Sequence, residues 1–370
     1  HFLDLGKARW RRWVRFTTAS GAPHEYNSPN YGGVDLSALA ALVQHVRDPA
    51  IHLQARLMYE RLWLHFALHV HRPTRQLAGP HCRCYWHPMM SGQGPLKELI
   101  WRETGWTWPL APGPYGGHAP VQLPAQLEMA LTEHHMPHFV TTWLEGQRSS
   151  MPYEVRETAN RDEGFDLTTY FSPSYALGTA GRTYGIGTDC FYIEHQSNYL
   201  HLYYARPGKP GVWLYLYSRY VVNDRHWGTL GAAPDRPKTH NFYDQGHFAG
   251  VQLRNKAIGL YALMPQQEEV HSLKTVVVFQ SGKELDGVWV NEQSVAVEGE
   301  LPSLSVGDWL IVADGGVYLG VYALKPSCLG REAPVRLERG PLGELWLTIY
   351  NYRGSPKRFW EYASLGGALW

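Results

Sequence analysis

The hydrophobic pattern of this 370-residue chain changes near residue 150, and this change restricts the folds open to it. Before that point, apolar side chains recur at the spacing of amphipathic helices. A clear series is Leu53, Leu57, Leu62, Phe66 and Val70. After that point, short aromatic and β-branched runs alternate with turn residues, which is typical of antiparallel strands and not of strand–helix–strand units. We therefore predict an α+β chain with a helical domain over residues 1–150 and an antiparallel β-sandwich domain over residues 151–370.

The helical half contains several segments with a helical pattern. Pro49 suits the first turn of the longest, since that position needs no backbone N–H donor. Asp35 precedes another segment and is predicted to be its N-cap. Residues 91–124 are rich in Gly, Pro and Trp and are predicted to form a long loop over a cleft. The predicted helices are residues 7–17, 36–46, 49–70, 125–134 and 138–144.

The second half alternates predicted strands with turns. Asp314-Gly315-Gly316 stands between two runs and is predicted to be a hairpin turn, because glycine readily adopts the positive φ that tight hairpins need. The predicted strands are residues 191–193, 199–204, 212–217, 257–262, 275–279, 287–290, 309–313, 317–322 and 345–350.

Composition narrows the classes of partner. Acidic and basic residues nearly cancel, with a formal net charge of +1, which argues against nucleic acid or a membrane surface as the main partner. The 15 Trp and 23 Tyr suit core packing, and they also suit a sugar-binding cleft in which rings stack on pyranose faces. No apolar run has membrane-spanning length and no signal peptide is visible. A cytoplasmic location is expected, or a secreted or periplasmic one if a signal segment preceded His1.

The cysteines form no dense framework. Cys82 and Cys84 are separated by one residue, and no CxxC pair occurs. These thiols are expected to be free in a reducing compartment, and a metal site with His81 or His87 is the alternative.

Two polar loops are the main candidates for a site. The first presents Glu25, Tyr26, Asn27 and Tyr31 in a segment that Pro29 and the Gly32-Gly33 pair should keep irregular. The second presents His81, Arg83 and Tyr85 at alternate positions, which would face the same way in an extended segment. Because two antiparallel helices connect these loops, we predict that the loops share one site.

Several longer motifs resemble those of a known group. They are "HEYNSPNYGGVDL", "LAGPHCRCY", "SYALGTAGRTYGIG", "QLRNKAIGLYAL" and "ADGGVYLGVYAL". They are similar to motifs in an uncharacterised branch of the heparinase II/III-like polysaccharide lyases. The resemblance implies an α/α toroid followed by an antiparallel β-sandwich. The helical part is too short for six hairpins, so a partial toroid is expected.

The resemblance also implies a reaction, β-elimination beside a uronic acid. Such a site needs donors to the uronate carboxylate, and Asn27, Arg83 and His81 are of the residue types that serve. A tyrosine would carry the proton, and Tyr85 or Tyr31 could do so beside a cation that stabilises phenolate. Predicted substrate-binding residues are Glu25, Tyr26, Trp106, Tyr184, His195 and Gln196. The expected partner is an acidic polysaccharide or oligosaccharide, and a homo-oligomer is left open.

Two other functions remain open. A glycoside hydrolase would use Glu25 and Asp35 as its paired carboxylates, although the predicted capping role of Asp35 disfavours this. A non-catalytic sugar-binding or assembly protein could keep the fold without the chemistry.

The lyase reaction implies no catalytic metal, and a structural metal ion is possible in the second half. Elimination requires no cofactor. His240, Asp244 and His247 form the best metal-like set of the second half and could hold a structural ion there.

Overall fold

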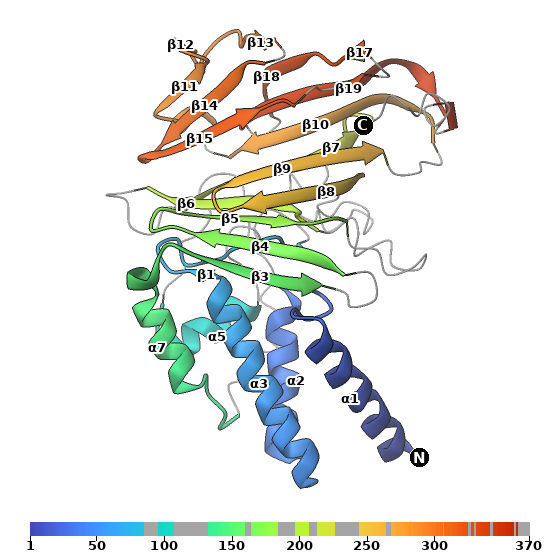
Figure 1. Cartoon of the computed structure of the whole chain (residues 1–370), viewed down its shortest axis with the longest axis vertical. Coiled ribbons are helices and arrows are strands. Elements are labelled where there is room, and N and C mark those ends of the chain that lie inside the picture. The colour runs from blue at the N-terminus through green and yellow to red at the C-terminus, as the bar shows by residue number, and fades with distance from the viewer. Residues whose placement is uncertain are drawn as a thin grey trace.

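A computed structural model of the chain (Figure 1) consists of a helical end and a series of antiparallel sheets stacked above it. The structure describes residues 1–84, 95–106, 132–159, 164–183, 197–206, 213–225, 244–263, 268–280, 282–305, 307–324, 327–328, 331–340, 343–358 and 360–361.

The helices occupy the N-terminal part, as predicted. Asp48 begins the longest helix, because its carboxylate accepts hydrogen bonds from the backbone N–H groups of Ala50 and Ile51, and Pro49 follows in the first turn. None of the described helices is both long enough and apolar enough to cross a bilayer. The helical elements are α1 (Phe2–Ala19), α2 (Tyr31–His45), α3 (Pro49–His69), α5 (Pro95–Thr104), α7 (His138–Gly146) and the short η2 (Gln147–Ser150).

The strands that follow form one large sheet, and every pairing within it is antiparallel. Its strands lie in the order β13-β18-β19-β10-β7-β6-β5-β4-β3. Because neighbours from β3 to β7 are consecutive in sequence, this part is a simple meander. The strands are β3 (Tyr153–Ala159), β4 (Phe165–Phe171), β5 (Tyr175–Ala180), β6 (Leu200–Ala205), β7 (Trp213–Val222), β10 (Val270–Phe279), β13 (Ser303–Leu304), β18 (Val335–Arg339) and β19 (Leu345–Lys357).

Smaller sheets complete the fold. A four-stranded sheet has the order β12-β11-β14-β15, and the predicted hairpin joins its last two strands, with Asp314 paired to Val317. Gly315 and Gly316 in that turn have φ values of +59° and +82°, which explains the requirement for glycine. The remaining strands form the two-stranded sheets β1–β2, β8–β9 and β16–β17. A short 3-10 turn, η4, precedes β11. Bounds are β1 (Val70–His71), β2 (Gln76–Leu77), β8 (Gly246–Leu253), β9 (Lys256–Leu263), η4 (Gly282–Glu284), β11 (Gly287–Val290), β12 (Gln293–Ser294), β14 (Trp309–Asp314), β15 (Val317–Tyr322), β16 (Ser327–Cys328) and β17 (Arg331–Glu332).

Separate buried clusters hold these layers together. One lies among the helices and contains apolar side chains of α2, α3, α5 and α7, with the largest share from α3. Another contains side chains of the large sheet, such as Leu216, together with Val312 of the four-stranded sheet. A third joins Tyr26 and Cys82 of the loop region to Phe165 and Phe248 of the strands, so the polar loops rest directly on the sheet. These apolar contacts place the candidate loops between the helices and β4–β8.

The predicted order of helices followed by antiparallel strands is confirmed, while the division into domains at residue 150 stays a prediction. The predicted loop over residues 91–124 is wrong in part, because α5 begins at Pro95 inside it. Residues 107–131 and 191–193 lie outside the described residues. The longer strands β3, β4, β5, β8 and β18 were not predicted from the pattern.

Candidate functional site

The two polar loops are in direct contact, which confirms the prediction that they lie together. Asn27 adopts a left-handed backbone conformation with φ of +44°, which asparagine tolerates better than most residues. Its carboxamide Nδ2 donates to the carbonyl of Ala78 at 2.7 Å and to that of Pro80 at 3.2 Å. Asn27 therefore fixes the second loop, and both bonds are buried.

His81 is held from both sides. Its Nδ1 lies 3.0 Å from the carbonyl oxygen of Asn27, and because a carbonyl only accepts, Nδ1 carries the proton. Its backbone pairs with Asn198, with N···O distances of 3.0 and 2.8 Å in the two directions. Burial lowers the pKa of His81 to about 4, so the imidazole is neutral near pH 7. His81 thus joins the loops to the strand region, with Nε2 as its basic nitrogen.

A more exposed layer lies beside this buried pair and consists of Glu25, Tyr31, Asp35 and Arg83. Arg83 Nη2 donates to the Tyr31 hydroxyl at 3.1 Å, and its guanidinium carbon is 5.0 Å from the centre of the Tyr31 ring. Arg83 Nε also forms an ion pair with Glu25 at 3.1 Å, and these side chains are 17% and 23% exposed. Tyr31 and Asp35 are four residues apart on α2, so they lie on one face of that helix. We call these four residues the Arg83 cluster.

The carboxyl groups of the Arg83 cluster titrate unusually. The pKa of Asp35 is raised to about 7, first because burial penalises its charged form and second because Glu25 is a neighbouring negative charge. Burial also raises the pKa of Glu25, while the positive charge of Arg83 opposes that rise. Near neutral pH the cluster therefore contains a carboxyl group that is close to half protonated, and a second one held by a cation.

The predicted N-cap role of Asp35 is wrong. Helix α2 begins at Tyr31, so Asp35 lies in its second turn. The Gly32-Gly33 pair was predicted to keep the segment irregular, but both residues lie inside α2. These positions are glycine because other helices approach them closely. A Cβ on Gly32 would lie 2.4 Å from the Phe66 ring, and one on Gly33 would lie 2.7 Å from the backbone of α5. Asp35 is consequently available for a role other than capping.

This environment predicts a pH dependence of stability. The pKa is 3.8 for an ordinary aspartate and about 7 for Asp35 in the folded chain, so between these values the folded chain keeps a proton that the unfolded chain releases. Raising the pH through this window should therefore lower the free energy of unfolding. Asp35→Asn keeps the shape of the acid but cannot ionise, and should lose less stability over the window. Thermal melting of both proteins at about pH 5 and about pH 8 measures the difference. Parallel losses in the two proteins would contradict the assignment.

The other candidate residues have different surroundings. Tyr26 is fully buried in the apolar cluster against Phe165, with ring centres 5.8 Å apart. Trp106 packs on the helical core, with the Arg72 guanidinium 6.0 Å from its ring centre. Asp244 is buried and accepts from the backbone N–H groups of Tyr220 and Gly246, while His247 is exposed on β8. Outside the described residues lie Tyr85, Tyr184, His195, Gln196 and His240.

The sequence patterns missed some buried polar residues. Lys97 on α5 is buried, donates to the side chain of Gln76, and has a pKa well below that of an ordinary lysine because of this burial. His65, His69 and Glu157 also gather inside the molecule. The four-residue spacing of the two histidines on one helix was an available signal for this group.

The Cys82 and Cys84 thiols are free, as predicted, and their burial raises the pKa of both. High thiol pKa values disfavour thiolate chemistry at neutral pH. These two cysteines are therefore buried residues on either side of Arg83, and they anchor its loop in the core.

Comparison with known proteins gives one match. Residues 7–111 match the model of a domain of unknown function, DUF8769. This segment covers less than half of the chain and includes all four residues of the Arg83 cluster. No curated protein and no solved structure matches the chain.

Proposed function

We propose that this protein is a polysaccharide lyase that cleaves beside a uronic acid by β-elimination, and that the Arg83 cluster is its active site. The observation that carries the proposal is the hydrogen bond from Arg83 to the hydroxyl of Tyr31. A tyrosine acts as a base only as phenolate, and a bonded guanidinium stabilises that anion. The motif resemblance and the order of helices before antiparallel sheets support the same class. In this proposal the helical part is a partial α/α toroid and the sheets are its β-sandwich.

The reaction assigns a role to each group. Arg83 binds the uronate carboxylate and stabilises the negative charge that builds on it. Tyr31 as phenolate removes the C5 proton, the C4–O bond breaks, and a C4–C5 double bond forms. The same tyrosine then returns the proton to the leaving oxygen. Asn27 and His81 are positioning residues here, since their hydrogen bonds hold the loop that carries Arg83.

A second candidate function is glycoside hydrolysis by Asp35 and Glu25. The observation that favours it is the pKa of Asp35, raised to about 7, beside a carboxylate paired with Arg83. A protonated acid near a second carboxylate is the arrangement that hydrolysis uses. The main objection to hydrolysis was the predicted N-cap role of Asp35, and that objection no longer applies because Asp35 lies in the second turn of α2.

One assay separates these functions. The full chain is incubated with polygalacturonate, alginate and hyaluronan, and both ultraviolet absorbance and reducing ends are followed. A lyase produces an absorbing unsaturated uronate together with new ends, whereas a hydrolase produces ends alone. Binding without either product would mean that the protein is a carbohydrate-binding module and would refute both enzyme proposals.

A further inference from the structure

Three buried side chains converge where α3 meets β3, away from the Arg83 cluster. They are His65 and His69 of α3 and Glu157 of β3, and one ligand atom from each lies within 4.8 Å of the others. The side chains of the two histidines are 6% and 3% exposed. The histidines are one helical turn apart and therefore face the same strand.

The orientation of His69 is fixed by its own helix. Its Nδ1 lies 2.9 Å from the backbone carbonyl of His65, so Nδ1 is the protonated nitrogen that donates this bond. Its Nε2 then points at Glu157 Oε2, 3.4 Å away. Metal-binding histidines commonly donate their second N–H to a backbone carbonyl in this way, which directs the other nitrogen at the ion.

The remaining polar atoms of the group are incompletely satisfied. His65 Nδ1 is 2.7 Å from Glu157 Oε1, which uses one atom of each side chain. His65 Nε2 and Glu157 Oε2 are buried and have no hydrogen-bond partner among the residues that the structure describes. Buried polar atoms without partners are costly, and a bound cation would satisfy them.

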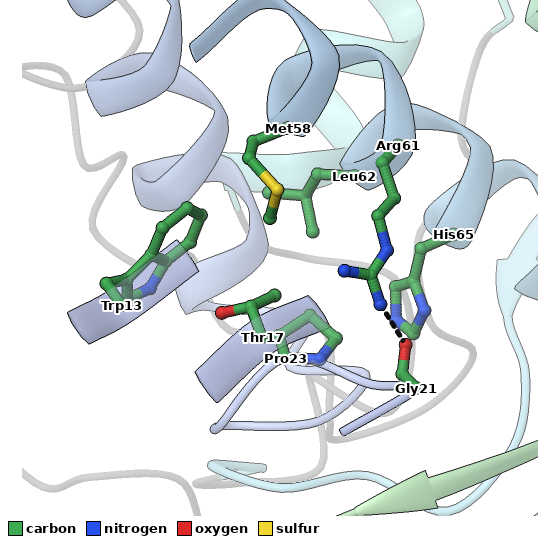
Figure 2. A pocket seen from close by; sticks show the side chains of 8 residues that line it. All are labelled: Trp13, Thr17, Gly21, Pro23, Met58, Arg61, Leu62 and His65. Carbon is green, nitrogen blue, oxygen red and sulfur yellow. Dashed lines mark hydrogen bonds between the residues drawn. The ribbon is translucent and has the colours of Figure 1, made fainter. Parts of the chain in front are cut away.

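A small pocket borders the group on the side of His65. Figure 2 shows His65 and Arg61 of α3 facing Trp13 and Thr17 of α1 across it, with Gly21 in the loop that follows. Arg61 donates to the carbonyl of Gly21 at 2.9 Å. The interior volume of about 10 Å³ is close to the minimum that one water molecule needs.

We propose that His65, His69 and Glu157 bind a Zn²⁺ ion, with a water molecule from the pocket as the fourth ligand. Two imidazoles and one carboxylate are a common zinc set with an open position. The 3.4 Å between His69 Nε2 and Glu157 Oε2 is the edge of a tetrahedron with bonds of about 2.1 Å. To complete the set, His65 must move slightly away from Glu157 Oε1, which lies 2.7 Å from its Nδ1.

The ion would connect the helices to the large sheet, since its ligands come from α3 and β3. A ligand that binds only the folded chain stabilises it, so added zinc should raise the melting temperature. Arg61 is a nearby cation and interacts electrostatically with Glu157, which weakens the attraction for a divalent ion. The site is independent of the proposed lyase reaction, and its test needs no substrate.

The test uses the full chain after treatment with a chelator. Titration with Zn²⁺ alone in a calorimeter should give one equivalent bound. His69→Ala and Glu157→Gln should each weaken binding by more than about 100-fold, since losing only an outer-shell partner costs 10- to 100-fold. His52→Ala is the matched control, because it removes another histidine of α3 and should leave binding unchanged.

Substitution with Co²⁺ gives a readout on the unaltered chain, so the test does not depend on the folding of a variant. Four-coordinate cobalt with nitrogen and oxygen ligands absorbs visible light strongly, and this spectrum is the expected result. A weak six-coordinate spectrum would overturn the proposal. Zinc binding that is equal in the His69→Ala and unaltered proteins, or that His52→Ala abolishes, would overturn it as well. In those cases His65, His69 and Glu157 are a buried ion-pair network.

Discussion

Tyr31→Phe is expected to reduce uronate elimination by about 100-fold or more, the usual contribution of a positioned acid–base group. The change removes the hydroxyl that accepts from Arg83 and keeps the ring that lies against the guanidinium. Substrate binding should therefore change little, and the loss should fall on kcat more than on KM. Initial rates of formation of the unsaturated product, measured over a range of substrate concentrations, give both constants.

The matched control is Tyr318→Phe, which removes a hydroxyl from a tyrosine that is 73% exposed on β15, far along the chain. It should leave the rate unchanged. If Tyr31→Phe stays active while Asp35→Asn loses turnover, the carboxylates carry the reaction and the hydrolase interpretation replaces the lyase.

Gly178→Ala is expected to be strongly destabilising, although it adds a single methyl group. A Cβ at Gly178 would lie 2.2 Å from the Cα of Gly79 and 2.5 Å from its carbonyl carbon. Both obstacles are backbone atoms, so no side-chain rotation relieves the clash, and β5 must separate from the loop before His81. We expect a loss at the upper end of the about 1–3 kcal/mol typical of overpacking, or more. Urea unfolding followed by circular dichroism measures it.

Gly320→Ala provides the comparison, since it is also a strand glycine. A Cβ there would lie 3.6 Å from the Ile311 side chain, which is ordinary contact. Its stability should change by less than about 1 kcal/mol. Equal effects of the two substitutions would mean that strand propensity, and not the contact with Gly79, sets the cost.

Local patterns were sufficient for the elements whose signals are local. Helix α3 follows from its apolar spacing and from Pro49 in its first turn, which are signals that act within a few residues. The turn at Gly315 and Gly316 follows for the same reason. Helix α2 begins earlier than predicted, since the glycine pair was read as a helix break. In the structure Gly32 and Gly33 allow α3 and α5 to approach α2 closely. That requirement is tertiary and has no signature in the neighbouring residues.

The site was predictable to the same extent. The contact between the Asn27 and His81 loops followed from helix pairing, which is a topological argument. The hydrogen bond from the Asn27 side chain to the Ala78 carbonyl could not be predicted, because its partner is far away in the sequence. The raised pKa of Asp35 could not be predicted either, because it depends mainly on burial in the folded chain. Glu157 lies 92 residues from His65, so its partnership could not be read from spacing.

The backbone pairing of His81 with Asn198 and the bond between His65 and Glu157 have a consequence for folding. Each joins a residue of the helical part to one of the strand part. If the strands unfolded first, His81 would lose both of its backbone bonds to Asn198, and Glu157 would lose its bond to His65. The two parts should therefore share one cooperative transition, with fluorescence and circular dichroism giving coincident curves. Residues 1–150 produced alone should form an expanded state without fixed tertiary packing.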